Sequence, residues 1–306
     1  MKFIKGNSNV VADTIPCSNV DAICFTNGIN LLEIARLQTD DSDLAACKQS
    51  PSFVGYMELL YHEDIPIDLI TEQLIGCKCE NICRLEDNCT CLSKSGMSYD
   101  MNGLLTNFMN PIFECNSECV CSQSCTNRVV QRYLNDAEFT FESEYHTKTY
   151  VTNHPVMGRG LKAACEIQRG ELVCVYLGEV IPYKEACLRE ALQLSCYGRN
   201  FIMIMREYSD HHLVSETCVD GNSESWGSVK SKARLINHSC TPNLTVVPVR
   251  VDSFIPYLAL FANKVIFEGT QLSYDYAQSV PSDKIRLSNT LCLCSSDSCR
   301  VYMPGV

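Results

Sequence analysis

The sequence has no long apolar segment, few glycines and prolines, and a deficit of positive charge. Its 306 residues include 11 prolines and 15 glycines, and no run of 18 or more apolar residues could cross a bilayer as a helix. The first residues turn polar at Gly6, too early for the apolar core of a secretory signal. With a hydrophobic content of 46%, the chain is predicted to form one or two compact domains, without secretion or membrane insertion.

Positive charge is scarce: 25 lysines and arginines face 36 aspartates and glutamates, which gives a net charge of -11. A groove that binds the nucleic-acid backbone needs the opposite balance, so direct sequence-specific DNA binding is not expected. An acidic surface suits a cationic partner such as a lysine-rich protein tail, because opposite potentials speed encounter.

Cysteine, in contrast, is abundant, with 21 residues. Without a secretory signal we expect a reducing compartment, where thiolates more often hold metal than form disulfides. Nine cysteines lie between Cys77 and Cys125 and three between Cys292 and Cys299, while the 166 residues between these groups hold six. The grouping divides the chain into an N-terminal segment (1–75), a first cysteine module (76–130), a central domain (131–280) and a C-terminal module (288–304). The N-terminal segment carries a helix-like stretch at 31–37 and no chemical motif.

The first cysteine group has an odd number of thiols in close spacing. Its members are Cys77, Cys79, Cys83, Cys89, Cys91, Cys115, Cys119, Cys121 and Cys125. A disulfide knot is the alternative, but an odd number disfavours it. Three tetrahedral zinc ions need twelve ligand positions, which six terminal and three bridging sulfurs supply. The group is therefore predicted to be a structural three-zinc cluster.

After about residue 158 the sequence changes to short apolar runs separated by turns. The runs at 171–177, 201–205, 246–251 and 258–262 predict strands. Residues 182–194 predict a helix, with a proline at its start and Glu185 four residues before Arg189. The fold class is predicted as mostly β (α+β).

Four motifs of this domain occur in an order typical of one family. They are residues 158–161 (GRGL), 176–179 (YLGE), 234–240 (RLINHSC) and 274–276 (YDY). In this order they resemble the SET-domain lysine methyltransferases, and the two cysteine groups resemble the pre-SET and post-SET modules of that family. The likeness covers about residues 75–303 and is strongest to family members fused to a mariner transposase. It implies a SET-domain pseudoknot of short strands, with a triangular three-zinc pre-SET cluster and a one-zinc post-SET clamp.

The resemblance implies S-adenosyl-L-methionine as cofactor, bound by Gly158, Arg159, Gly160, Phe201, Arg234, Asn237 and His238. On their own, two glycines around an arginine more often form a plain turn, and a single histidine is more often structural. The family places a tyrosine at the position of Phe201 and a glutamate at that of Val175, so the chain departs from its pattern there. It also implies a fourth zinc held by Cys240, Cys292, Cys294 and Cys299, the alternative being a free buried Cys240.

The resemblance implies that Tyr276 is the catalytic tyrosine and that Tyr176 forms a second wall of the lysine channel. It implies that Tyr274 limits the number of methyl groups added to the lysine. We expect Tyr274, on the same strand face as Tyr276, to hold a water where a third methyl group must turn. Mono- and dimethylation are therefore predicted.

The implied substrate is histone H3, as a tail or in the nucleosome, which places the protein in the nucleus on the chromosome. The pre-SET class favours lysine 9, and the likeness to transposase-fused members keeps lysine 36 open. A non-histone substrate, or a catalytically weak chromatin-binding module, are the alternatives. The sequence makes no prediction of the oligomeric state.

Overall fold

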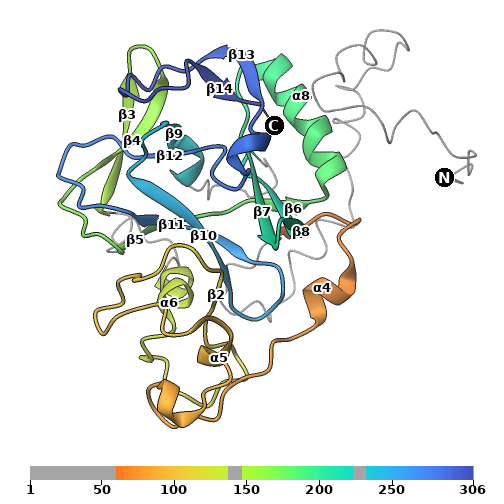
Figure 1. Cartoon of the computed structure of the whole chain (residues 1–306), viewed down its shortest axis with the longest axis vertical. Coiled ribbons are helices and arrows are strands. Elements are labelled where there is room, and N and C mark those ends of the chain that lie inside the picture. Colours follow the sequence, from red (N-terminus) through yellow and green to blue (C-terminus); the bar gives the residue numbers. More distant parts are fainter. Residues whose placement is uncertain (1–59, 137–146, 223–231, 306) are drawn as a thin grey trace, which may run out of the picture. The chain divides into compact units, whose positions relative to one another are not determined.

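The computed structural model describes residues 60–136, 147–222 and 232–305, shown in Figure 1. The helix predicted at 31–37 lies outside the described residues. The described residues fall into two compact units. The larger unit contains residues 60–186 and 201–305, and a separate unit contains residues 187–200, which include most of helix α8 (Tyr183–Tyr197). The predicted helix at 182–194 is confirmed as α8.

A four-stranded sheet carries the core of the larger unit. Its strands are β2 (Ile112–Phe113), β10 (Leu244–Arg250), β11 (Tyr257–Ala262) and β5 (Leu172–Tyr176), in the order β2-β10-β11-β5. Every residue of β5 is buried, as are five of the six residues of β11. Strands covered on both faces read as continuous apolar runs, which is why the sequence predicts them. The three predictions at 171–177, 246–251 and 258–262 are confirmed.

A second four-stranded sheet has the order β1-β6-β8-β7. Its strands are β1 (Leu60–Tyr61), β6 (Glu179–Ile181), β8 (His212–Asp220) and β7 (Ile202–Ser209). β7 and β8 form an antiparallel hairpin whose turn places Asp210 and His211 at φ of 48° and 67°. The predicted strand at 201–205 is confirmed and extends further.

Three two-stranded pairs complete the larger unit. They are β3 (Thr149–His154) with β4 (Gly158–Ala163), β13 (Leu287–Leu291) with β14 (Tyr302–Pro304), and the parallel pair β9 (Asn237–His238) with β12 (Ser273–Tyr274). The 3-10 turn η4 (Lys232–Leu235) leads into β9, and η5 (Ser282–Lys284) precedes β13. The pairing of β9 with β12 joins two segments distant in sequence, as expected of the predicted pseudoknot.

The first cysteine module is mostly irregular. Its short helical elements are η2 (Leu85–Asp87) and α5 (Leu92–Ser95); α4 (Ile67–Thr71) precedes it, and α6 (Val129–Asp136) begins at its end. The buried carboxylate of Glu114 accepts hydrogen bonds from the first-turn amides of α6, Val130 N at 2.8 Å and Gln131 N at 3.0 Å, and from the Tyr99 hydroxyl at 2.7 Å. Burial raises the pKa of Glu114. The mostly β (α+β) class is confirmed, and no described helix has the length and apolar character needed to cross a membrane.

Candidate active site and metal centres

The nine thiols of the first cysteine module form a cluster of their own, packed around one another and Leu92. Eight of the nine cysteines are buried, and Cys119 is half-buried. Neighbouring sulfurs lie 3.5 Å apart for Cys77 and Cys83, and 3.4 Å for Cys83 and Cys115. Four sulfurs around a tetrahedral zinc with Zn–S bonds of about 2.3 Å lie about 3.8 Å apart. The sulfur atoms are therefore spaced as zinc ligands.

Three overlapping groups of four thiols occur within this cluster. They are Cys77, Cys83, Cys115 and Cys121; Cys77, Cys91, Cys115 and Cys119; and Cys77, Cys79, Cys83 and Cys89. Cys77 occurs in all three groups and Cys83 and Cys115 in two, whereas the other five members occur once and Cys125 belongs to none of the groups. A sulfur that bridges two metal ions must belong to the ligand groups of both ions. Cys77, Cys83 and Cys115 are therefore the candidate bridging thiolates.

Arg128 lies against this cluster, with only 1% of its surface exposed. Its guanidinium donates to Cys121 Sγ at 3.5 Å and to the Asn116 carbonyl at 3.2 Å, and it bonds the Gln131 side chain. Burial alone would lower the pKa of Arg128, but the Cys121 thiol and neighbouring thiols raise it above the usual value. A buried cation beside many thiolates offsets part of their negative charge.

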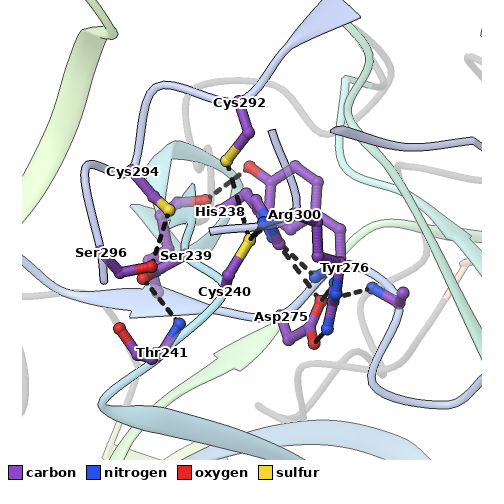
Figure 2. Close-up of polar contacts among 12 residues, drawn as sticks. His238, Ser239, Cys240, Thr241, Asp275, Tyr276, Cys292, Cys294, Ser296 and Arg300 are labelled. Atoms are coloured by element: carbon purple, nitrogen blue, oxygen red, sulfur yellow. Dashed lines mark hydrogen bonds and ion pairs between the residues drawn. The ribbon is translucent and has the colours of Figure 1, made fainter. Parts of the chain in front are cut away.

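The second thiol group joins Cys240 to the C-terminal module. Cys240, Cys292, Cys294 and Cys299 lie within 4.8 Å of one another, and the Cys240 and Cys292 sulfurs are 3.8 Å apart. All four cysteines are half-buried rather than buried. A closed set of four thiols suits one zinc ion, and Figure 2 shows three of them, Cys240, Cys292 and Cys294, beside His238 and Tyr276.

The pairing of β9 with β12 brings the predicted catalytic and cofactor residues together. Asn237 lies opposite Ser273 and His238 opposite Tyr274. The rings of Tyr274 and Tyr276 have centroids 4.6 Å apart, and the His238 ring meets Tyr276 edge-on at 5.2 Å. The two motifs thus form one site.

Tyr176, the third predicted tyrosine, lies at the edge of this cluster. Its hydroxyl donates to the Phe201 carbonyl at 2.5 Å, and its ring packs on Gly221, where a Cβ would lie 2.9 Å from the hydroxyl oxygen. Burial, and then the nearby Tyr276, raise the pKa of both Tyr176 and Tyr274. Their hydroxyls therefore stay protonated. Tyr276 is 41% exposed, and its hydroxyl donates to the Ile236 carbonyl at 2.9 Å.

The expectation that Tyr274 and Tyr276 share a strand face is wrong in one respect. β12 ends at Tyr274, and Tyr276 lies in the following turn, where the Gln278 amide bonds to the Asp275 carbonyl. The two rings still meet because the chain bends at Asp275. A second correction concerns Gly158 and Gly160, which begin strand β4 instead of forming a turn; the turn precedes them at residues 155–157.

His238 connects the tyrosines to the second thiol group (Figure 2). Its Nδ1 accepts a hydrogen bond from the Tyr276 amide at 3.2 Å, and its Nε2 lies 3.3 Å from Cys240 Sγ. Burial lowers the pKa of His238 despite the nearby Asp275 carboxylate, so the ring is neutral at pH 7. With Nδ1 as acceptor, the proton is assigned to Nε2, which donates to the sulfur.

The other predicted cofactor residues surround Asn237. Its side chain donates to the Arg159 carbonyl at 3.3 Å, and a Cβ on Gly160 would lie 2.7 Å from Asn237 Nδ2. A side chain at position 160 would therefore displace the Asn237 amide from its present position. Gly158, at φ of 75°, pairs with His154 in the β3–β4 hairpin, and no described contact joins it to Asn237 or His238.

Arg234 completes this surface. Its guanidinium lies over the Phe201 ring at 5.3 Å. Burial, and then the positive charge of Arg159, lower the pKa of Arg234. Among the described residues neither arginine forms an ion pair with a carboxylate. Two arginines without an acidic partner fit a ligand that carries a carboxylate, such as the amino-acid part of S-adenosylmethionine.

A cavity of about 510 Å³ begins two residues beyond Tyr276. It is lined by Arg206, Tyr208, His211, Gln278, Ser279, Val280, Pro281, Asp283 and Lys284. The Ser279 hydroxyl bonds the Ile204 carbonyl at 3.1 Å and so ties one wall to β7. Sequence reasoning missed this cavity, because its walls come from segments about 70 residues apart.

Sequence reasoning also missed Arg300, although it directly follows the last cysteine of the group. Its guanidinium makes two hydrogen bonds to the Asp275 carboxylate, one of them Nη1 to Oδ1 at 2.8 Å. Burial alone would raise the pKa of Asp275, but the hydrogen bonds and charge of Arg300 outweigh it and lower that pKa. Asp275 is thus ionised at neutral pH.

Known proteins resemble the chain in the same regions. Residues 158–277 match the family model of the SET domain, and residues 31–128 match that of the Pre-SET motif. Histone-lysine N-methyltransferase SETMAR of Bos taurus is 36% identical over 244 residues, which cover 75% of this chain and 74% of that protein. SETMAR of Homo sapiens is equally similar, but the match spans only 33% of its length.

Solved structures agree with this assignment. The methyltransferase domain of human SETMAR has a TM-score of 0.62 and 33% identity, over 83% of this chain and 92% of that one. KRYPTONITE, solved with mCHH DNA, an H3(1-15) peptide and SAH, has a TM-score of 0.60 and 25% identity, over 83% of this chain and 48% of that one. The chain belongs to the SET-domain family of S-adenosylmethionine-dependent histone-lysine N-methyltransferases.

Proposed function

We propose that the chain transfers methyl groups to a lysine of histone H3, with lysine 9 favoured and lysine 36 the next candidate, and stops mainly at mono- and dimethyllysine. The observation that carries the proposal is the grouping of Tyr176, Tyr274 and Tyr276 beside the Asn237–His238 pair. A partly exposed tyrosine with two buried ones behind it offers an aromatic opening to one lysine side chain.

The substrate lysine must be neutral to accept a methyl group. Its pKa of about 10.4 makes deprotonation at pH 7 cost about 4.6 kcal/mol in water. Aromatic walls lower this cost, because desolvation disfavours the ammonium. The tyrosine hydroxyls provide acceptors that orient the amine, and alignment is the larger part of their contribution. A bound S-adenosylmethionine supplies the methyl group on a sulfonium.

Seven residues are proposed to hold that cofactor: Gly158, Arg159, Gly160, Phe201, Arg234, Asn237 and His238. The close approach of Gly160 to Asn237 supports this set, as do the two arginines, which form no ion pair with a carboxylate among the residues that the structure describes. Arg159 and Arg234 are assigned to the carboxylate, and the Phe201 ring to an aromatic or cationic part of the ligand.

The cavity beyond Tyr276 is proposed to receive the residues that flank the substrate lysine. Its walls carry both charges, with Asp283 negative and Arg206 and Lys284 positive, and the chain's net charge of -11 favours a basic tail over DNA. Since histone tails are found on chromatin, the proposed location is the nucleus and the chromosome.

Four zinc ions are proposed, three in the pre-SET module and one in the post-SET module. Nine thiols supply the twelve ligand positions of three tetrahedral ions when three of the sulfurs are shared, and the group of Cys240, Cys292, Cys294 and Cys299 suits a fourth ion. All these positions are filled by sulfur, so the metals serve structure rather than catalysis.

The test combines metal-replete protein, S-adenosylmethionine carrying a labelled methyl group, and H3 tail peptides with single lysines changed to arginine. Label should appear on H3 peptides containing lysine 9 or lysine 36, and Tyr276→Phe should abolish it. Label on array peptides from non-histone proteins, without label on H3 peptides, would indicate a non-histone substrate. H3 binding without label would indicate a chromatin-binding module.

Tyr274 tests the proposed product state. Its hydroxyl stays protonated in a buried position next to Tyr276, where it occupies the space for a third methyl group. Tyr274→Phe is expected to shift products toward trimethyllysine with little change in the first transfer, as measured by mass spectrometry. If the wild-type protein yields mostly trimethyllysine, Tyr274 does not limit the number of methyl groups added.

A further inference from the structure

Arg300 closes a ring of contacts around the proposed catalytic tyrosine (Figure 2). Its guanidinium pairs with Asp275, and its backbone amide donates to Cys240 Sγ at 3.4 Å. From Cys240 the contacts pass through His238 to the Tyr276 amide. Arg300 is thus bonded at both ends of a path that includes a metal ligand and the turn that carries Tyr276.

The acceptor of the ion pair is well placed to hold that turn. Asp275 Oδ1 also accepts the Ala277 amide at 3.0 Å and lies 3.7 Å from His238 Nδ1. The side chains of Asp275 and Arg300 are 15% and 27% exposed, so the pair is shielded from much of the solvent. A two-point guanidinium–carboxylate contact fixes direction as well as distance.

The rest of the C-terminal module has little other attachment. Residues 286–302 contain no buried side chain, and β13 pairs only with β14. Without the ion pair, the four-thiol group would be the main link between this module and the β9–β12 site. The His238 ring lies on the same path, because its Nε2 is 3.3 Å from Cys240 Sγ and its Nδ1 accepts the Tyr276 amide, so both ring nitrogens have defined neighbours.

We propose that Arg300 is a positioning residue that, through Asp275 and His238, sets the backbone of Tyr276 against the post-SET zinc site. The inference rests on the proposed function, because it gives a catalytic role to Tyr276. The inference can also be tested without measuring turnover. The backbone amides of Tyr276 and Ala277 donate hydrogen bonds within this network, so their hydrogens should exchange slowly with solvent.

The experiment compares zinc-loaded Arg300→Met, Arg300→Lys and Arg286→Met with the wild type. Arg286 is exposed two residues before this module and forms no ion pair in the described residues, so its variant serves as the matched control. Arg300→Met should lower kcat about 10- to 100-fold, because a small misplacement of a reacting group has that effect. KM should change less than about threefold, with zinc content retained, and Arg300→Lys should recover part of kcat.

Hydrogen exchange at Tyr276 and Ala277 is measured on the same proteins. It should be faster in Arg300→Met and unchanged in Arg286→Met. Loss of zinc together with activity would show a merely structural role and overturn the proposal, as would unchanged kcat and exchange. If the wild type methylates no H3 peptide, the proposed function fails, and the exchange rates still decide whether Arg300 orders the turn.

Discussion

The two thiol groups of this chain share one ligand chemistry in opposite surroundings. In the pre-SET module eight of nine cysteines are buried, and the cluster packs around itself, Leu92 and the buried Arg128. In the post-SET module all four cysteines are half-buried, and the surrounding residues 286–302 are exposed or half-buried. The first group replaces a hydrophobic core, whereas the second attaches a segment that has none.

The groups also differ in what they contact. Cys240 touches His238, whose other ring nitrogen accepts the Tyr276 amide. No described contact joins any of the nine pre-SET cysteines to a proposed catalytic or cofactor residue. The difference teaches that burial and functional coupling are separate properties of a metal site. Removing the first metals should therefore affect stability, and removing the last should affect turnover.

The largest expected effect is that of Cys115→Ser. Cys115 recurs in two four-thiol groups, so its loss should release more than one zinc, and binding of a structural zinc contributes about 10 kcal/mol or more to the folding of the segment that holds it. The pre-SET module is expected to lose its fold, as seen by elemental analysis for zinc and by thermal unfolding. Cys121→Ser, which removes a thiol that occurs in one group, should release less metal. Cys165→Ser, at an exposed free thiol, is the control. Equal zinc loss in Cys115→Ser and Cys121→Ser would contradict the assignment of bridging thiolates.

A smaller effect on stability is expected of Arg128→Met. The change removes a buried cation 3.5 Å from Cys121 Sγ and leaves the thiolate charge without its partner. Breaking a buried charge pair costs about 3 to 5 kcal/mol, so urea unfolding should move by that amount. Arg84→Met, at an exposed arginine of the same module, should change stability by less than about 0.5 kcal/mol. A similar small change in Arg128→Met would mean that the cluster does not need this cation.

Much of this comparison could be predicted from the sequence, because its signals are local. The strands of the central sheet are continuous apolar runs, and the cysteine spacing predicts the first metal group, whereas the second group, with Cys240, follows from the family resemblance. The number of shared thiols follows from ligand arithmetic, but their identity does not. Strand β8 was missed because polar residues interrupt its apolar ones, so that no continuous apolar run marks it, and its first residues, from His212, are exposed.

Contacts between residues that are distant in sequence and meet only in the folded protein could not be predicted from the sequence. Asp275 lies within a recognised motif, yet its partner Arg300 is 25 residues away and resembles any other surface arginine in the sequence. Arg128 likewise gives no sign that its side chain turns inward to the thiols. In both cases the charge is visible in the sequence, whereas the burial that gives it a role depends on the fold.

The smallest effect on stability, with a large effect on turnover, is expected of Cys292→Ser. Its sulfur lies 3.8 Å from Cys240 Sγ in a module without buried residues, so global stability should fall by only about 1 kcal/mol. One zinc should be lost, His238 should lose its fixed neighbour, and kcat should fall about 100-fold or more because Tyr276 is no longer held. Zinc content, the melting temperature and methyl transfer to H3 peptides measure the three quantities on one preparation. A loss of stability as large as that of Cys115→Ser would erase the distinction between the two metal sites, since the post-SET zinc would then also be part of the folding core.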